Sequence, residues 1–126
     1  MLHSRMKRVG HTIRNEIGEI IQTEIKDPRL GFVTVQHVEV SKDLQQAIVF
    51  VSVLSDDPEE IAATLDALDR ARGYIRGVLG RRVVLKFLPS LKFRLHEGAK
   101  HAVKVDELLK KIEQGRPIAD EELEEP

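Results

Sequence analysis

Cysteine is absent from the 126 residues of this chain. Disulfide bonds, thiolate nucleophiles and cysteine-ligated zinc sites are therefore excluded, and the composition is compatible with a reducing compartment. Tryptophan is also absent, and aromatic residues make up 4% of the chain, so a platform for stacking unpaired bases is poorly supplied. If the chain binds nucleic acid, we expect contacts to phosphate and sugar.

Long apolar runs are missing as well. No stretch approaches the roughly 20 residues that a membrane-spanning helix needs, and Met1 to Glu16 lack the apolar centre of a secretory signal. We therefore expect a soluble, cytoplasmic protein. The length fits one domain with a short tail, which we place at residues 1–113 and 114–126.

Positive charge is concentrated in two parts of a chain whose formal net charge is −1. Between Arg70 and Lys104 there are ten Lys or Arg residues and one acid, Glu97, and the first fifteen residues hold four bases and no acid. The residues from Ser55 to Asp69 show the opposite, with six acids and no base. If the two basic parts share a face, they form an anion-binding surface with an acidic rear. Scattered solvated charge is the alternative.

The start of the sequence predicts a long amphipathic helix. Apolar residues recur at spacings of three and four from Val9 to Ile25, so one apolar stripe lies along the helix. The helix should end before Asp27, because Pro28 disfavours the helical conformation of the residue before it. Three basic residues precede the stripe and are expected to be frayed in the free protein: Arg5, Lys7 and Arg8.

The next part predicts an antiparallel β-hairpin. Apolar residues alternate over Phe32 to Ser41, and the phase slips by one residue at Gln36-His37, as a β-bulge requires. Turn-forming residues follow at 41–44. The β-branched run from Ala47 to Leu54 then predicts the best-covered strand of the sheet.

Two helices are predicted after the hairpin. Asp57 is a good N-cap, and Pro58 suits the first helical position. Gly73 should kink the chain into a second, shorter helix that ends at Gly80. The kink places basic residues around a helix-helix junction, Ala71-Arg72-Gly73, and such a junction suits a phosphate backbone.

The remaining elements complete an α+β fold. Residues 83–95 alternate as a third strand, which Pro89 restricts to an edge or a break. Val105 to Ile112 predicts a short last helix, and the acidic residues after Gln114 are expected to be disordered. The predicted order is helix, strand, strand, helix, kinked helix, strand and short helix, with a three-stranded sheet covered by helices.

Several short sequences stand out by their order and spacing: Lys26-Asp27-Pro28-Arg29-Leu30, Val33-Thr34-Val35, Val40-Ser41 before Asp43-Leu44 and Ala47, Ala71-Arg72-Gly73 before Ile75-Arg76, and Pro89-Ser90-Leu91-Lys92-Phe93. Together they resemble the bacterial ribosome-binding factor A family, over about Arg5 to Ile112. The resemblance implies a type II KH-like domain, which agrees with the predicted element order.

The resemblance also implies a non-enzymatic factor without metal or cofactor. It would bind the small ribosomal subunit or its precursors, assist late maturation of the rRNA including its 5′ end, and be needed most in the cold. An assembly GTPase is left open as a second partner, and we expect a monomer that does not bind membranes.

Family members carry Ala-x-Gly where KH domains have a Gly-x-x-Gly loop whose backbone amides approach phosphates. Contacts should then depend more on arginines than on amides, and recognition on shape more than on sequence. Neutralising about six phosphates would lower affinity roughly 10³-fold between 50 and 200 mM salt. The candidate RNA-binding residues are Arg5, Lys7, Arg8, Arg29, Ala71, Arg72, Gly73, Arg76, Arg81 and Arg82.

Two other functions stay open. A protein-interaction module could dock a basic partner through the acidic helix start at Asp56 to Glu60. A small hydrolase could use His96 or His101, but these lie five apart, about 140° out of phase on a helix, where a zinc-binding pair needs a spacing of four. The family often has an acid at the position of His96, so no role of that carboxylate is carried over to this chain.

Overall fold

The computed structural model describes residues 2–28, 30, 32–85, 87–97 and 110. The six elements in this part of the chain follow the predicted order. The predicted last helix at 105–112 and the tail at 114–126 lie outside the described residues, except Lys110. The elements are α1 (Leu2–Thr23), β1 (Val33–Val40), β2 (Gln46–Val53), α2 (Pro58–Arg70), α3 (Arg72–Arg82) and β3 (Ser90–Leu95).

Helix α1 packs its apolar stripe on the sheet. Ile13, Ile17 and Ile20 are fully buried, which confirms the helical period of the sequence. Gly10 sits where α1 comes closest to β1, because a Cβ there would lie 2.9 Å from the Val38 carbonyl oxygen. Helix α1 begins at Leu2 and includes the three N-terminal basic residues that were expected to be frayed in the free protein.

The sheet has the order β1-β2-β3, with β1 antiparallel and β3 parallel to β2. The register of β1 against β2 shifts between Val35 and His37, which confirms the predicted bulge. Strand β2 is central and buries all residues from Ala47 to Val51, as expected for the best-covered strand. The same residues are paired with a neighbouring strand on both sides, so the sheet is fixed around β2.

The third strand is shorter than the alternation predicted. Residues 83–85 and 87–89 lie between α3 and β3 and do not join the sheet. Strand β3 starts at Ser90, whose N–H donates to the Gln45 carbonyl at 2.9 Å. Pro89 has no N–H to donate, so the ladder can begin only after it. The prediction that this strand lies at an edge is confirmed.

Helices α2 and α3 meet at Ala71. The Asp57 carboxylate caps α2 by accepting the Glu59 N–H at 2.9 Å, and Pro58 occupies the first turn, as predicted. The break falls at Ala71, two residues before Gly73, and α3 continues past Gly80 to Arg82, so both predicted positions are corrected. Glycine lowers helix propensity, but it does not fix where a helix bends.

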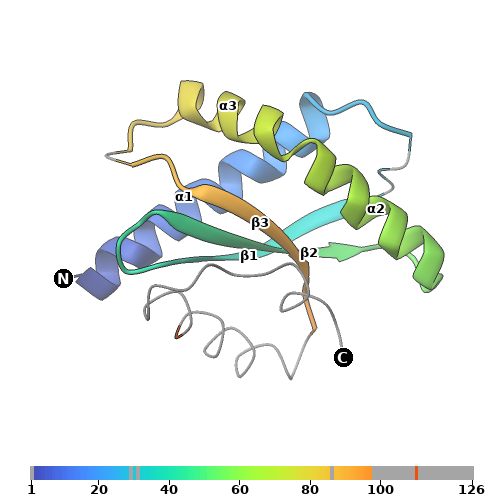
Figure 1. Cartoon of the computed structure of the whole chain (residues 1–126), viewed down its shortest axis with the longest axis horizontal. Helices are drawn as coiled ribbons and strands as arrows, with labels where there is room; N and C mark the ends of the chain where they lie inside the picture. The colour runs from blue at the N-terminus through green and yellow to red at the C-terminus, as the bar shows by residue number, and fades with distance from the viewer. Residues whose placement is uncertain (1, 29, 31, 86, 98–109, 111–126) are drawn as a thin grey trace.

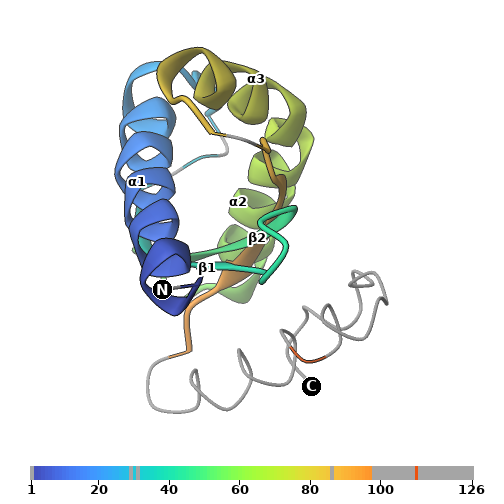
Figure 2. The same cartoon turned by 90° about the vertical axis from the view of Figure 1, so that its left-hand side faces the viewer.

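The three helices in the described part of the chain cover one face of the sheet, with α1 beside α3 (Figures 1 and 2). The core between the two layers contains apolar residues from every element. The start of α1 and the β1–β2 turn lie at one end of the domain, and the end of α1 and the start of α2 lie at the other (Figure 1). Among the described helices, none has the length and apolar character needed to cross a membrane.

Candidate nucleic-acid interface

The three N-terminal bases are exposed on α1 but do not share one face. A helix turns by about 100° per residue, so Arg5 and Arg8 are neighbours, whereas Lys7 lies roughly 200° around the helix from Arg5. Arg5 lines a cleft of about 190 Å³ with apolar residues of the β1–β2 turn and of the segment that follows α3. The start of α1 and the chain leaving α3 are thus brought together at one end of the domain. The cleft is lined by Arg5, Val9, Leu44, Val84, Leu85 and Phe87.

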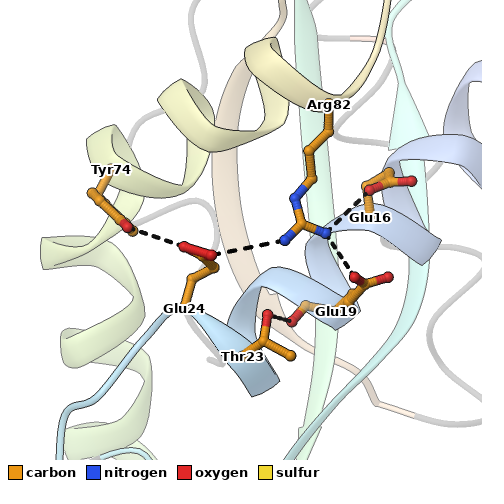
Figure 3. Close-up of polar contacts among 6 residues, drawn as sticks. All are labelled: Glu16, Glu19, Thr23, Glu24, Tyr74 and Arg82. Atoms are coloured by element: carbon orange, nitrogen blue, oxygen red, sulfur yellow. Dashed lines mark hydrogen bonds and ion pairs between the residues drawn. The ribbon is translucent and has the colours of Figure 1, made fainter.

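Arg82, at the end of α3, is held by carboxylates of α1 and of the residue just after it (Figure 3). Its Nη1 lies 2.9 Å from Glu19 Oε1 and 3.5 Å from Glu16 Oε2, and its Nη2 lies 3.9 Å from Glu24 Oε1. Glu24 also accepts a hydrogen bond from the Tyr74 hydroxyl at 3.2 Å. The hydrogen bond that Arg82 donates to Glu19 is the main cause that raises the pKa of Arg82 above its usual value. This ion-pair cluster ties α3 to α1.

The cluster also changes the charge of an α1 surface. Glu16 and Glu19 follow Arg8 at helical spacing, on the α1 face that carries Arg5. Without a partner, these two carboxylates would repel a polyanion that approaches the two arginines. Arg82 offsets part of their negative charge, so the repulsion toward a polyanion is weaker than the two acids alone would cause. We call this surface the basic edge and define it by Arg5 and Arg8, both of which are exposed. Arg81 is exposed near the end of α3.

Arg76 has internal partners rather than a free guanidinium. Its Nη2 donates to the Leu88 carbonyl at 2.7 Å and its Nε donates to the Pro89 carbonyl at 3.0 Å. These two bonds fix the segment that leads into β3. Arg76 and Arg82 were both predicted to contact RNA, and the structure gives each of them a use within the fold.

The α2–α3 junction presents a second basic site. Arg70 Nε lies 3.0 Å from Asp66 Oδ2, and Arg72 Nη1 lies 3.1 Å from Asp69 Oδ1. Exposed pairs of this kind contribute little to stability, so both arginines can exchange a carboxylate for a phosphate. Ala71 is half-buried and serves as the junction itself.

The start of α3 is open to an approaching anion. Its N-cap makes no side-chain hydrogen bond, and its first turn holds no acid. A Cβ added to Gly73 would meet no atom within 4 Å, so this part of the backbone faces free space. Helix N-termini favour negative charge, and backbone amides there can supplement Arg72. Arg29, the last candidate, lies outside the described residues.

Sequence reasoning missed the acids that pair with Arg82 and so occupy its guanidinium group. Glu16 and Glu19 are three residues apart on the same stripe as Arg8, and that spacing was the available signal. Their pairing with Arg82 spans 63 residues for Glu19, and no local pattern encodes it. Within the described ranges, no group of three or more His, Asp or Glu side chains could hold a metal ion.

Comparison with known proteins decides the family. Residues 5–109 match the family model for ribosome-binding factor A. The chain belongs to the ribosome-binding factor A family. A ribosome-binding factor A from Halothermothrix orenii is 43% identical over 114 residues, which cover 90% of this chain and 93% of that protein. The sequence resemblance is thereby confirmed.

Solved structures of the family share the fold. The crystal structure of ribosome-binding factor A from Thermus thermophilus has a TM-score of 0.61 and 32% identity, over 70% of this chain and 92% of that chain. A homology model of the Thermus thermophilus factor, fitted into a cryo-EM map of its complex with the 30S subunit, has a TM-score of 0.55 and 34% identity. It covers 66% of this chain and 86% of that chain. The predicted α+β class is confirmed.

Proposed function

We propose that this chain binds the small ribosomal subunit or its precursors through the rRNA backbone and assists late maturation of that rRNA, including its 5′ end. The observation that carries the proposal is the family match over residues 5–109. The fit of a Thermus thermophilus relative into a 30S complex supports the choice of particle. The chain acts by binding energy and makes no covalent bond.

The basic edge and the α2–α3 junction supply two places for phosphates. The basic edge offers two exposed guanidinium groups, and Arg82 offsets part of the negative charge of the acids further along the helix. The junction offers Arg70, Arg72 and the uncapped start of α3. Arginine is suited to both, because its planar group can bind a phosphate with two parallel hydrogen bonds. Two separated contacts would hold two rRNA segments in one arrangement while the subunit matures.

Two measurements test the proposal. Purified protein should co-sediment with small subunits, and its affinity should fall steeply with salt, since each phosphate contact releases counterions. In bacterial cells whose own family member is deleted, the chain should reduce the amount of 5′-extended small-subunit rRNA, measured by primer extension after growth in the cold.

A variant with both basic-edge arginines of α1 reversed, Arg5→Glu with Arg8→Glu, should fail in the same cells at equal protein level. If the wild-type chain binds subunits but leaves the 5′-extended rRNA unchanged, the maturation part of the proposal is refuted. If neither chain binds subunits, the whole proposal is refuted.

A further inference from the structure

An exposed apolar pair lies at the end of the domain opposite the start of α1. Phe32 and Leu54 lie just outside the paired parts of β1 and β2, and the Leu54 N–H donates to the Phe32 carbonyl at 3.1 Å. Each of the two side chains is 80% exposed. Exposed apolar residues are ordinary when scattered, but an adjacent pair next to concave surface is typical of an interaction site.

Two clefts flank this pair, and Pro28 lines both. The larger cleft, about 610 Å³, lies between the end of α1 and the start of β1. The smaller, about 350 Å³, lies between the end of β2 and the first turns of α2. Figure 1 shows these segments together at one end of the domain. The larger cleft is lined by Ile21, Gln22, Ile25, Lys26, Asp27, Pro28, Leu30, Phe32 and Val33.

The surface beside the smaller cleft is acidic. Glu60 is part of its lining, and three more exposed acids stand at the start of α2: Asp56, Asp57 and Glu59. The first turn of α2 contains no base. The Asp57 carboxylate caps the helix. The carboxylates of Asp56 and Glu59 are exposed and can contact a ligand. Carboxylates here repel a phosphate backbone and attract cations.

We propose that this apolar-acidic end docks a basic protein segment that inserts one or more apolar side chains beside Phe32 and Leu54. Apolar anchors in pockets with charges at the rim are the usual arrangement of a protein interface. The inference rests on the proposed function in one respect: the segment belongs to a protein of the particle that the chain binds. A second copy of this chain is a poor occupant, because it would place the same acids against each other.

The test places a photoreactive benzoylphenylalanine at position 32, where it resembles the native side chain in shape. The full-length chain is mixed with purified small subunits, sedimented, irradiated and treated with nuclease, and the adducts are identified by mass spectrometry. A control chain carries the same group at Val84, which is fully exposed and lines the cleft at the opposite end. A third chain combines the probe at position 32 with Asp56→Lys and Glu59→Lys, which leave the cap intact.

The expected result is a nuclease-resistant adduct to one basic protein from position 32 and none to that protein from position 84. The lysine substitutions should lower the adduct yield about fivefold or more, because they remove the attraction at the rim. Co-sedimentation with an adduct only to RNA, or with no adduct, overturns the inference and leaves the proposed function standing. Loss of co-sedimentation by the unmodified chain overturns both.

Discussion

The two ends of this domain use charge in opposite ways. At the end with the start of α1, Arg5 and Arg8 are exposed, and further along the same helix Arg82 pairs with the acids Glu16 and Glu19. At the other end, the carboxylates at the start of α2 stay exposed beside apolar side chains. The comparison shows that the nearly neutral net charge hides a basic surface and an acidic one.

The largest effect should come from reversing charge at the basic edge. We expect Arg5→Glu with Arg8→Glu to weaken binding to small subunits about 100-fold, or roughly 2.7 kcal/mol, because two attractive contacts become repulsive. The measurement is filter binding at a fixed salt concentration.

The same helix offers a matched control for this double change. Lys7 and Arg14 are seven residues apart and share a different face of α1. Lys7→Glu with Arg14→Glu changes the net charge equally, and we expect a loss of less than about fivefold from the long-range field alone. Equal losses in the two double variants would show that total charge, not the basic edge, determines binding.

A substitution at Arg76 tests the distinction between an arginine that stabilises the fold and an arginine that is free to bind rRNA. Arg76→Met should lower the free energy of unfolding by about 2 kcal/mol, since the Leu88 and Pro89 carbonyls lose a charged donor. Urea denaturation measures this loss. Arg81→Met, an equal change at an exposed position of the same helix, should cost less than about 0.5 kcal/mol. If Arg76→Met leaves stability unchanged but weakens binding more than Arg81→Met, the assignment of the two arginines is reversed.

Gly73 tests the junction without disturbing the fold. Gly73→Ala should raise the free energy of unfolding by about 0.5 kcal/mol, because alanine is the better helix former and its methyl meets no protein atom. If rRNA approaches the start of α3, the same methyl should weaken binding about threefold to tenfold by holding a phosphate away from the amides. Binding as tight as that of the wild type would place the rRNA elsewhere.

The smallest effect is expected at Arg82. Arg82→Gln should lower the melting temperature less than Arg76→Met does, because its ion pairs lie at the solvent-accessible surface, where such pairs contribute little to stability. Binding should also weaken, by about threefold, since the negative charge of Glu16 and Glu19 is then no longer partly offset by Arg82. Both losses should shrink at about 0.5 M salt, where exposed charges are screened. A binding loss that persists at high salt would indicate that Arg82 touches the rRNA directly.

Periodic parts of the sequence predicted the fold well. The buried stripe of α1, the bulge after Val35 and the central position of β2 all follow from local spacing, and the structure confirms them. The alternation after α3 was misleading, because apolar side chains can alternate in a connecting segment whose backbone has no strand to pair with. The bend was predicted at Gly73 but lies at Ala71, since the position of a bend depends on packing as well as on glycine.

The sequence predicts a concentration of basic residues at the candidate site, but not the partners of each arginine. Clustered basic residues identify a surface for polyanions, yet they do not reveal which guanidinium groups the fold itself uses. Arg76 is bound to carbonyls twelve and thirteen residues away, and Arg82 to carboxylates in another helix. Such long-range partners depend on how the helices pack, and a single sequence gives no signal for them.

The central claim is that the basic edge, not the apolar-acidic end, faces the rRNA. Because the chain has no cysteine, single cysteines can carry tethered iron-EDTA at Thr12→Cys, which follows Arg8 by one helical turn, and at Glu59→Cys, at the start of α2. Hydroxyl-radical cleavage of small-subunit rRNA should be strong from position 12 and weak from position 59. Strong cleavage from position 59 with little from position 12 would contradict the account.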